Sequence, residues 1–99
     1  MEDYRGAILD YNKAIELDPG FKKAYYSRGV CKSKLEDYRG AILDYNKAIE
    51  LDPECKIAYF DRGICKYLMG EIDGACLDFS KAGELGYWKA YDLIQEYCN

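Results

Sequence analysis

Apolar side chains recur at helical spacing along segment 36–52, where they are separated by steps of three or one residues. On an α-helix this spacing gathers them on one stripe and leaves most charged side chains outside it. No alternation at period two accompanies the pattern, so it predicts a helix with one buried face and argues against strands. The stripe consists of Tyr38, Ala41, Ile42, Tyr45, Ala48 and Ile49.

The same pattern occurs three times along the chain. Glu2–Pro19 recurs without change as Glu36–Pro53, an offset of 34 residues, and a weaker copy follows at Gly70–Gly86. Self-similarity at a period of about 20–50 residues marks repeat architectures, in which each unit buries its apolar face against the next. The sequence therefore predicts an all-α solenoid.

A second helical segment lies between these copies and is itself repeated. Lys22–Leu35 matches Lys56–Met69, and both contain Ala-Tyr-aromatic-x-Arg-Gly-aliphatic-Cys-Lys. Gly29 and Gly63 fall in the middle of these predicted helices, where glycine costs about 1 kcal/mol relative to alanine. A glycine repeated at such a place indicates that two helix backbones approach closely. The short linkers predict that neighbouring helices run antiparallel, as helical hairpins.

Six helices are expected, at about 3–17, 21–35, 37–51, 55–69, 71–84 and 88–98. Asp52-Pro53 ends the third, because proline cannot continue the hydrogen-bond ladder. The corresponding division is one domain with a half repeat at 1–20, repeats at 21–54 and 55–87, and a cap helix at 88–99. The cap is expected to cover the last apolar face. Its predicted inward-packing residues are Trp88, Tyr91, Ile94 and Tyr97.

Composition narrows the classes of partner. The 99 residues suit one small domain, and 18 acidic against 14 basic residues give a net charge of −4. Without a basic run, neither nucleic acid nor an anionic membrane surface is an expected partner. The longest apolar stretches, such as Ile57–Phe60, are too short to span a bilayer, and no leader peptide is expected.

Five cysteines and no histidine limit the metal and redox chemistry. The cysteines lack the close paired spacing of a zinc site, so neither a metal nor any other cofactor is expected. Cys31 and Cys65 occupy equivalent points of successive repeats, and we interpret them as small buried apolar residues rather than disulfide partners. This cysteine usage favours a reducing compartment, and hence a cytoplasmic location.

The chain resembles the tetratricopeptide repeat family over essentially its whole length. The resemblance lies in the 34-residue period, the predicted helical hairpins and the motif that recurs in each of them. Arg28 and Arg62 stand where the family most often has leucine, which resembles an Arg-Gly variety of the repeat. We expect them to pair with the equally repeated Asp44 and Asp78 across the seam between helices. The residues that carry the resemblance are Tyr25, Gly29, Ala41, Tyr45, Ala48 and Pro53, then Tyr59, Gly63, Ala75, Phe79 and Ala82.

The resemblance implies a right-handed superhelix that acts as a protein–protein interaction scaffold and binds a peptide or helix on its concave face. The first helix of each hairpin would line that face. An aromatic and aliphatic groove with sparse charge suits an extended peptide or a helix. The alternative is that its aromatic residues only pack against neighbouring helices. Carried over residue by residue, the predicted groove consists of Lys23, Tyr26, Ser27, Val30, Lys34, Ile57, Phe60, Asp61, Ile64 and Tyr67.

One use of the family is a clamp for the C-terminal carboxylate of chaperones. It needs lysine and asparagine side chains at set groove positions. The corresponding positions here are Tyr26, Ser27, Val30, Ile57 and Asp61. Because Asp61 would repel a carboxylate, we predict that the chain has no such clamp activity.

Two other functional classes are disfavoured by the residues present. An enzyme is not expected, because no histidine can act as a general base near neutral pH and no Gly-rich phosphate loop exists. The repeated carboxylates Asp10, Asp44 and Asp78 would also stand about 10 Å apart after stacking, too far for a dyad. A helical-repeat RNA reader needs a basic surface, whereas this chain is acidic.

Self-assembly is an alternative compatible with peptide binding. The chain begins with the second helix of a hairpin, so its apolar stripe is expected to lack part of its cover. A second copy packing there would form a homodimer through Met1–Leu17, or the helix would fray. The repeated identity also fits a recent duplication, a fragment of a longer repeat protein or an engineered repeat. This stripe consists of Tyr4, Ala7, Ile8, Tyr11 and Ala14.

Overall fold

A computed structural model describes residues 3–98, which form six α-helices and no strand. Every helix lies within about one residue of its predicted range. The prediction of an all-α chain with a short last helix is thus confirmed. The helices are α1 (Tyr4–Leu17), α2 (Lys22–Lys34), α3 (Tyr38–Leu51), α4 (Lys56–Leu68), α5 (Ile72–Glu84) and α6 (Lys89–Tyr97).

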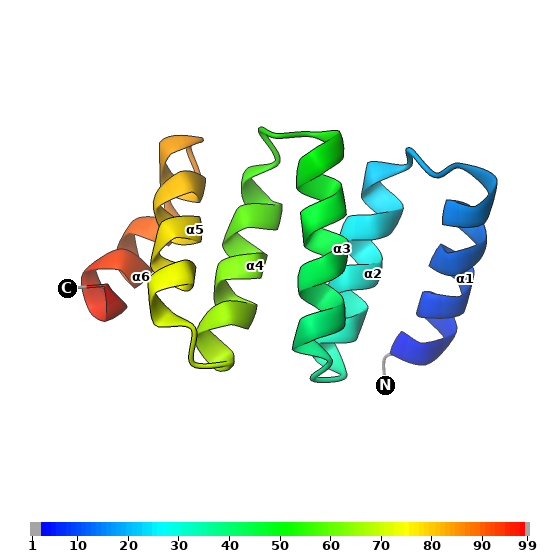
Figure 1. Cartoon of the computed structure of the whole chain (residues 1–99), viewed down its shortest axis with the longest axis horizontal. Helices are drawn as coiled ribbons and strands as arrows, with labels where there is room; N and C mark the ends of the chain where they lie inside the picture. Colours follow the sequence, from blue (N-terminus) through cyan, green and yellow to red (C-terminus); the bar gives the residue numbers. More distant parts are fainter. Residues whose placement is uncertain (1–2, 99) are drawn as a thin grey trace.

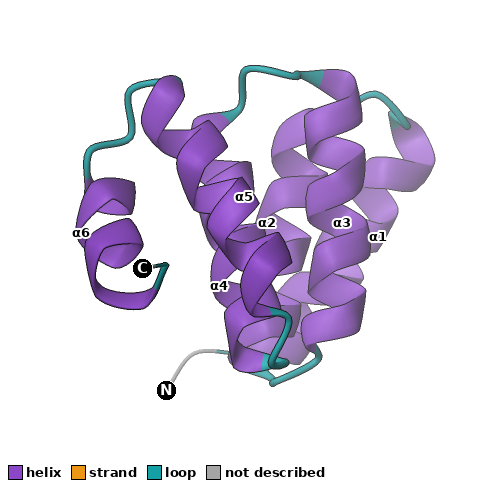
Figure 2. Ribbon diagram, turned by 60° about the vertical axis from the view of Figure 1, so that its left-hand side comes forward, coloured by secondary structure: helices purple, strands orange, loops and turns teal. Residues whose placement is uncertain are grey.

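The helices stack side by side along the long axis of the molecule, with the two termini at opposite ends (Figure 1). The connections alternate between the two ends of the helices, so successive helices run antiparallel (Figure 1, Figure 2). The molecule measures 42 × 26 × 21 Å. Each helix packs on its neighbours in the chain, and α2 also contacts α4. This arrangement is an α-solenoid of helical hairpins, as the repeat predicts.

Repeated aspartates explain why α1 and α3 begin where they do. Asp3 accepts a hydrogen bond from the Gly6 backbone amide at 2.9 Å, and Asp37 accepts one from the Gly40 amide at 3.0 Å. Such caps satisfy amides that the first turn of a helix leaves without a partner. The identical segments therefore start identical helices.

The core consists of small residues and rings alternating along the helix seams. Gly29 and Gly63 make this packing fit: a Cβ atom at either one would lie 2.7 Å from a ring carbon, of Tyr45 and of Phe79 respectively. The prediction of a close approach is right. The group that approaches Gly29 is the Tyr45 ring, whereas at Gly63 the backbone carbonyl oxygen of Ala75 also comes close, 3.2 Å from the added Cβ, beside the Phe79 ring. The buried apolar residues include Ala24, Tyr25, Ala41, Tyr45, Ala48, Ala58, Cys65, Ala75, Phe79, Ala82 and Ala90.

The cap helix differs from its prediction at Trp88, which is 83% exposed, so the inward packing expected of it is wrong. Tyr91 is 52% exposed, but its ring lies against Gly83 of α5, where an added Cβ atom would be 2.9 Å from the ring, so it does pack on the preceding helix. The buried residue is Ala90, which takes the place that Ala58 has in α4. Counting back from it, Trp88 matches the exposed Lys56, so register with α4 turns the indole to solvent. Ile94 does pack against the last core cluster, as predicted.

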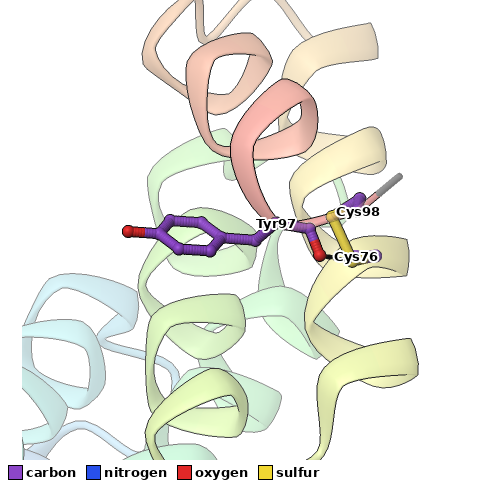
Figure 3. Close-up of a disulfide and its surroundings, with 3 residues drawn as sticks. All are labelled: Cys76, Tyr97 and Cys98. Atoms are coloured by element: carbon purple, nitrogen blue, oxygen red, sulfur yellow. Dashed lines mark hydrogen bonds between the residues drawn. A yellow bond between two sulfur atoms is a disulfide. The ribbon is translucent and has the colours of Figure 1, made fainter.

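A disulfide between Cys76 in α5 and Cys98 just after α6 fastens the cap (Figure 3). Their Cα atoms are 5.7 Å apart. The backbone carbonyl oxygen of Tyr97 lies 4.0 Å from the Cys76 sulfur, while its ring projects to the other side, toward α4 (Figure 3). That ring packs on Tyr67 with centroids 4.7 Å apart. The disulfide is a finding that the cysteine pattern did not predict, whereas Cys31 and Cys65 are buried as expected.

Removing this disulfide with Cys98→Ser is expected to lower the free energy of unfolding by about 2–3 kcal/mol. The bond closes a loop with a sequence separation of 22 and so restricts the unfolded chain. Urea denaturation followed by circular dichroism measures the loss. The matched control is Cys55→Ser, at a free buried cysteine: adding reductant should destabilise this control but leave Cys98→Ser unchanged. Reductant sensitivity of Cys98→Ser would contradict the assignment.

Candidate functional site

A hollow of about 410 Å³ lies where α2, α3 and α4 meet. Rings and aliphatic side chains form much of its wall, and charged groups from α2, α4 and the turn after α2 stand among them. Because it is open and mixed in character, it suits side chains of a polypeptide better than a small molecule. Its lining residues are Tyr26, Val30, Ser33, Lys34, Glu36, Tyr38, Tyr45, Asp61, Ile64 and Leu68.

A short hydrogen bond connects α2 to α4 across this hollow. The Tyr26 hydroxyl donates to the Asp61 carboxylate at 2.6 Å. Burial raises the pKa of Asp61, while this hydrogen bond and the charge of Lys34 oppose the rise. Burial, together with Asp61, raises the pKa of Tyr26. The pair therefore fixes the spacing of the two helices and places an acidic group in the hollow.

The structure brings half of the predicted groove residues together and sets the others apart. Lys23 and Ile57 are exposed, and Ser27 is half-buried, away from the lining of the hollow. Phe60 and Tyr67 pack instead against rings in the C-terminal part of the stack, as described next. The predicted residues that line the hollow are Tyr26, Val30, Lys34, Asp61 and Ile64.

Phe60 and Tyr67 make aromatic contacts with the C-terminal part of the stack. The Phe60 ring lies 5.7 Å from Phe79 and 4.7 Å from Tyr87, measured between centroids. Tyr67 packs on Tyr97 in the same manner. Tilted ring pairs at these distances are typical of stable packing. For these two residues the packing alternative is therefore the better description.

Sequence reasoning missed several residues of the hollow. Ser33 lies in the last turn of α2, Glu36 lies in the turn that follows, and Tyr38 begins α3. The groove was sought only on the first helix of each hairpin, so Glu36 and Tyr38 were not considered, and Ser33 is on that helix but was not among the positions carried over. The signal was available, because Tyr38 lies on the apolar stripe one turn before Ile42.

The predicted arginine–aspartate pairing is confirmed in both repeats. Arg28 in α2 donates through Nε and Nη2 to the two oxygens of Asp44 in α3, at 2.9 and 2.7 Å. Arg62 in α4 donates to the two oxygens of Asp78 in α5 in the same way, at 2.8 and 2.7 Å. Asp44 and Asp78 are nearly fully buried, at 3% and 4% exposure. Each carboxylate raises the pKa of its arginine, because it stabilises the charged guanidinium.

Each arginine also reaches back to the preceding hairpin. The Nη1 atom of Arg28 donates to Asn12 in α1, and that of Arg62 donates to Asn46 in α3, both at 2.8 Å. Lysines add a second cation to each aspartate, with Lys32 3.3 Å from Asp44 and a matching lysine in α4. One guanidinium thus connects three successive helices. We call this arrangement the arginine seam.

The apolar stripe of α1 has the exposure expected of a stripe that lacks part of its cover. We call this stripe the α1 edge, and it consists of Tyr4, Ala7, Ile8, Tyr11 and Ala14. No residue of Tyr4–Leu17 is buried, although the identical α3 buries four of its residues. All five residues of the α1 edge are half-buried. Contacts between chains through Met1–Leu17 stay a prediction, and Met1 and Glu2 lie outside the described residues.

Other kinds of site find no support in the described part of the chain. Within residues 3–98, no group of three or more histidine, cysteine or acidic side chains is placed to hold a metal ion. The same residues contain no helix with the length and apolar character that crossing a membrane requires.

Solved structures resemble this chain closely in fold. The first tetratricopeptide repeat region of Spaghetti (RPAP3), bound to the HSP90 peptide SRMEEVD, matches with a TM-score of 0.91 at 24% identity, covering 96% of this chain and 77% of that one. MamA matches at 0.86 and 28% identity over 89% of this chain, which spans 53% of that chain. The second repeat region of Spaghetti, with the same peptide, matches at 0.81 and 28% identity, covering 83% and 76%.

No curated protein matches the chain in sequence. Two family profiles do match it, both described as tetratricopeptide repeat, at residues 1–21 and 23–55. Together these matches span more than half of the chain, and they agree with the helical period and with the solved structures. The chain belongs to the tetratricopeptide repeat family.

Proposed function

We propose that the chain is a non-catalytic protein–protein interaction module that binds an extended peptide or a helix in the hollow between α2 and α4. The observation that carries this proposal is the hollow itself, held open by the Tyr26–Asp61 hydrogen bond. The two Spaghetti repeat regions, which are bound to a peptide, support the same kind of function. A preorganised surface of this kind limits the entropy lost on binding.

The chemistry of the hollow indicates what kind of peptide it accepts. Leu68 is 54% exposed at its rim and offers an apolar contact. Asp61 and Glu36 provide acceptors, and Lys34 is the cation of the lining. A ligand with an apolar anchor next to a basic or hydrogen-bond-donating side chain satisfies these groups. An acidic carboxyl terminus does not, because two carboxylates already line the hollow.

A phage-displayed peptide library selected against the 99-residue chain tests this function. Peptides that bind the hollow are expected to lose affinity about tenfold when Leu68→Ala removes the rim contact, which corresponds to about 1.4 kcal/mol. Fluorescence anisotropy with labelled peptides measures the change. The matched control is Leu43→Ala, at a leucine of α3 that is 69% exposed and lies outside the hollow. Equal losses in both variants would contradict the assignment.

The HSP90 peptide SRMEEVD provides a negative ligand for the same assay. We expect no binding, because Asp61 lies where the chaperone clamp needs a group that attracts a carboxylate. Micromolar binding of this peptide would overturn that expectation.

The cytoplasmic location inferred from the cysteines stays a prediction. The Cys76–Cys98 disulfide argues in the other direction, because disulfides persist mainly in oxidising compartments.

A second candidate function is self-association through the α1 edge. The observation that favours it is the burial contrast between α1 and the identical α3. Light scattering coupled to size exclusion, over a range of concentrations, measures the solution mass against 11.4 kDa for one chain. A dimer that dissociates with Tyr11→Glu would support this function, and a monomer at all concentrations would exclude it.

A further inference from the structure

The Cys76–Cys98 disulfide lies on the wall of a second hollow, between α5 and α6. This hollow has a volume of about 640 Å³, and its wall includes both cysteines together with Leu77, Ile94 and Tyr97. We call it the disulfide cleft. Leu77 is 73% exposed, and both cysteines are half-buried rather than buried. A thiol from solution can therefore approach the sulfur atoms while the chain is folded.

The other three cysteines have a different environment. Cys31, Cys55 and Cys65 lie outside the disulfide and are buried. Burial raises the pKa of the Cys65 thiol, which lowers its fraction of reactive thiolate. A reagent that acts on the folded chain therefore meets one accessible sulfur pair, and the buried thiols exchange with it only after unfolding.

The disulfide holds in place a ring that covers part of α4. Cys98 directly follows Tyr97, the last residue of α6, and the Tyr97 ring projects toward α4 on the side opposite to the sulfur atoms (Figure 3). That ring packs on Tyr67 with centroids 4.7 Å apart. One repeat earlier, the position of Tyr67 belongs to Ser33, which lines the open hollow between α2 and α4. A pair of rings thus occupies the corresponding place in the second repeat.

Little else holds this end of α6 on the stack. The helix has nine residues, and its one buried residue, Ala90, lies in the first turn, far from Cys98. Helices this short are marginal without tertiary contacts. By contrast, α5 buries five of its residues and is joined to α4 by the arginine seam. Opening the disulfide is therefore expected to loosen the second half of α6 and to leave α5 in place.

We propose that Cys76–Cys98 is a redox modification site that a dithiol reduces in the folded chain, and that reduction releases the second half of α6 and uncovers Tyr67. A thiolate of the dithiol attacks one sulfur, forms a mixed disulfide and expels the other cysteine as a thiolate. The second thiol of the reductant then attacks the mixed disulfide and completes the exchange. The protein gains two electrons and two protons, and the dithiol becomes a disulfide. This switch does not depend on the proposed function.

Reduction under native conditions distinguishes this site from a disulfide that opens only when the chain unfolds. The 99-residue chain is incubated with dithiothreitol, quenched with iodoacetamide and mapped by mass spectrometry. We expect alkylation of Cys76 and Cys98 alone, at a rate proportional to the concentration of dithiothreitol. Labelling of all five cysteines together, a rate that reaches the limit set by unfolding, or no reduction at all would overturn the proposal.

Hydrogen exchange followed by NMR measures what reduction releases. In the reduced chain, the amides of Leu93–Tyr97 are expected to exchange about tenfold faster or more, while those of Ala41–Ala48 in α3 keep their protection. Cys98→Ser should show the reduced pattern with or without dithiothreitol, and the matched control Cys55→Ser should respond to it as the natural chain does. Unchanged protection of Leu93–Tyr97, or equal loss in α3, would overturn the proposal.

Tyr97→Ala separates the ring from the bond, because it keeps the disulfide. In the oxidised form of this variant, the ring resonances of Tyr67 should move toward their positions in the reduced natural chain, since the covering ring is gone. The amides of Leu93–Gln95 should stay protected until dithiothreitol is added. Tyr67 resonances that match those of the oxidised natural chain would mean that Tyr97 is not its cover, and would overturn the proposal.

Discussion

Tyr45→Ala is expected to lower the free energy of unfolding by about 3–5 kcal/mol. The Tyr45 ring is 1% exposed, rests on Gly29 and lies 5.8 Å from the Tyr26 ring between centroids. Removing the ring leaves a cavity in the middle of the stack, between Gly29 of α2 and the core residues Ala41 and Cys65. The surrounding helices can collapse into such a cavity only in part. For a domain whose total stability is about 5–15 kcal/mol, such a loss is a large fraction. Urea denaturation followed by circular dichroism measures it.

The chain contains its own control for this variant. Tyr11 stands in an identical segment of 18 residues but is half-buried, so Tyr11→Ala is expected to cost only about 1 kcal/mol. Helix propensity and neighbouring residues cancel in this comparison, and the difference reports the packing around the ring. If both variants lose the same stability, the two rings are equally covered in solution and the described contrast between them is wrong.

Asp44→Ala is expected to cost about 3–4 kcal/mol. The substitution leaves Arg28 and Lys32 with no carboxylate, and their side chains are only 18% and 24% exposed. Breaking a buried ion pair from one side is strongly destabilising because the remaining charge is poorly solvated. Arg28 keeps its hydrogen bond to Asn12, which limits the loss. Thermal and urea denaturation of the variant, both by circular dichroism, give the change.

Asp10→Ala is the matched control, because Asp10 has the same neighbours in sequence and no ion pair in the described structure. We expect a change within about 0.5 kcal/mol, as for other exposed sites. A double variant with Arg28→Met separates pairing from burial. If the seam works as described, Asp44→Ala should cost much less in the Arg28→Met background than in the natural chain. An unchanged cost there would show that the pairing is not responsible.

The fold was predictable because the repeat encodes it several times. An offset of 34 residues, glycines in the middle of alternate helices and paired arginines and aspartates all depend on local spacing that a sequence displays directly. The pairing of Arg28 with Asp44 follows from it, since both residues recur together. Period and spacing do not show what approaches a glycine, so the Tyr45 ring on Gly29 was found only in the structure.

The parts that escaped prediction are those that break the period. The buried alanines Ala82 and Ala90 are two residues closer in sequence than the corresponding Ala48 and Ala58. This shift in register decides that Trp88 faces solvent and that Cys98 meets Cys76. The two cysteines do not stand at repeat-equivalent positions, so the repeat pattern does not predict that disulfide.

The hollow was predicted only in part, for a different reason. Its lining combines residues of α2 and α4 with Tyr38 of α3. A groove carried over from the family places residues on the first helix of each hairpin only.

The most direct test of the account is native-state hydrogen exchange of the two identical helices, measured residue by residue. Intrinsic exchange rates are equal for Ala7–Ala14 and Ala41–Ala48, because the flanking sequences are the same. If cover by an Arg-Gly helix stabilises α3 and leaves α1 open, the amides of Ala41–Ala48 should exchange on the order of 100-fold more slowly than their α1 counterparts. Equal protection of the two helices would contradict the account.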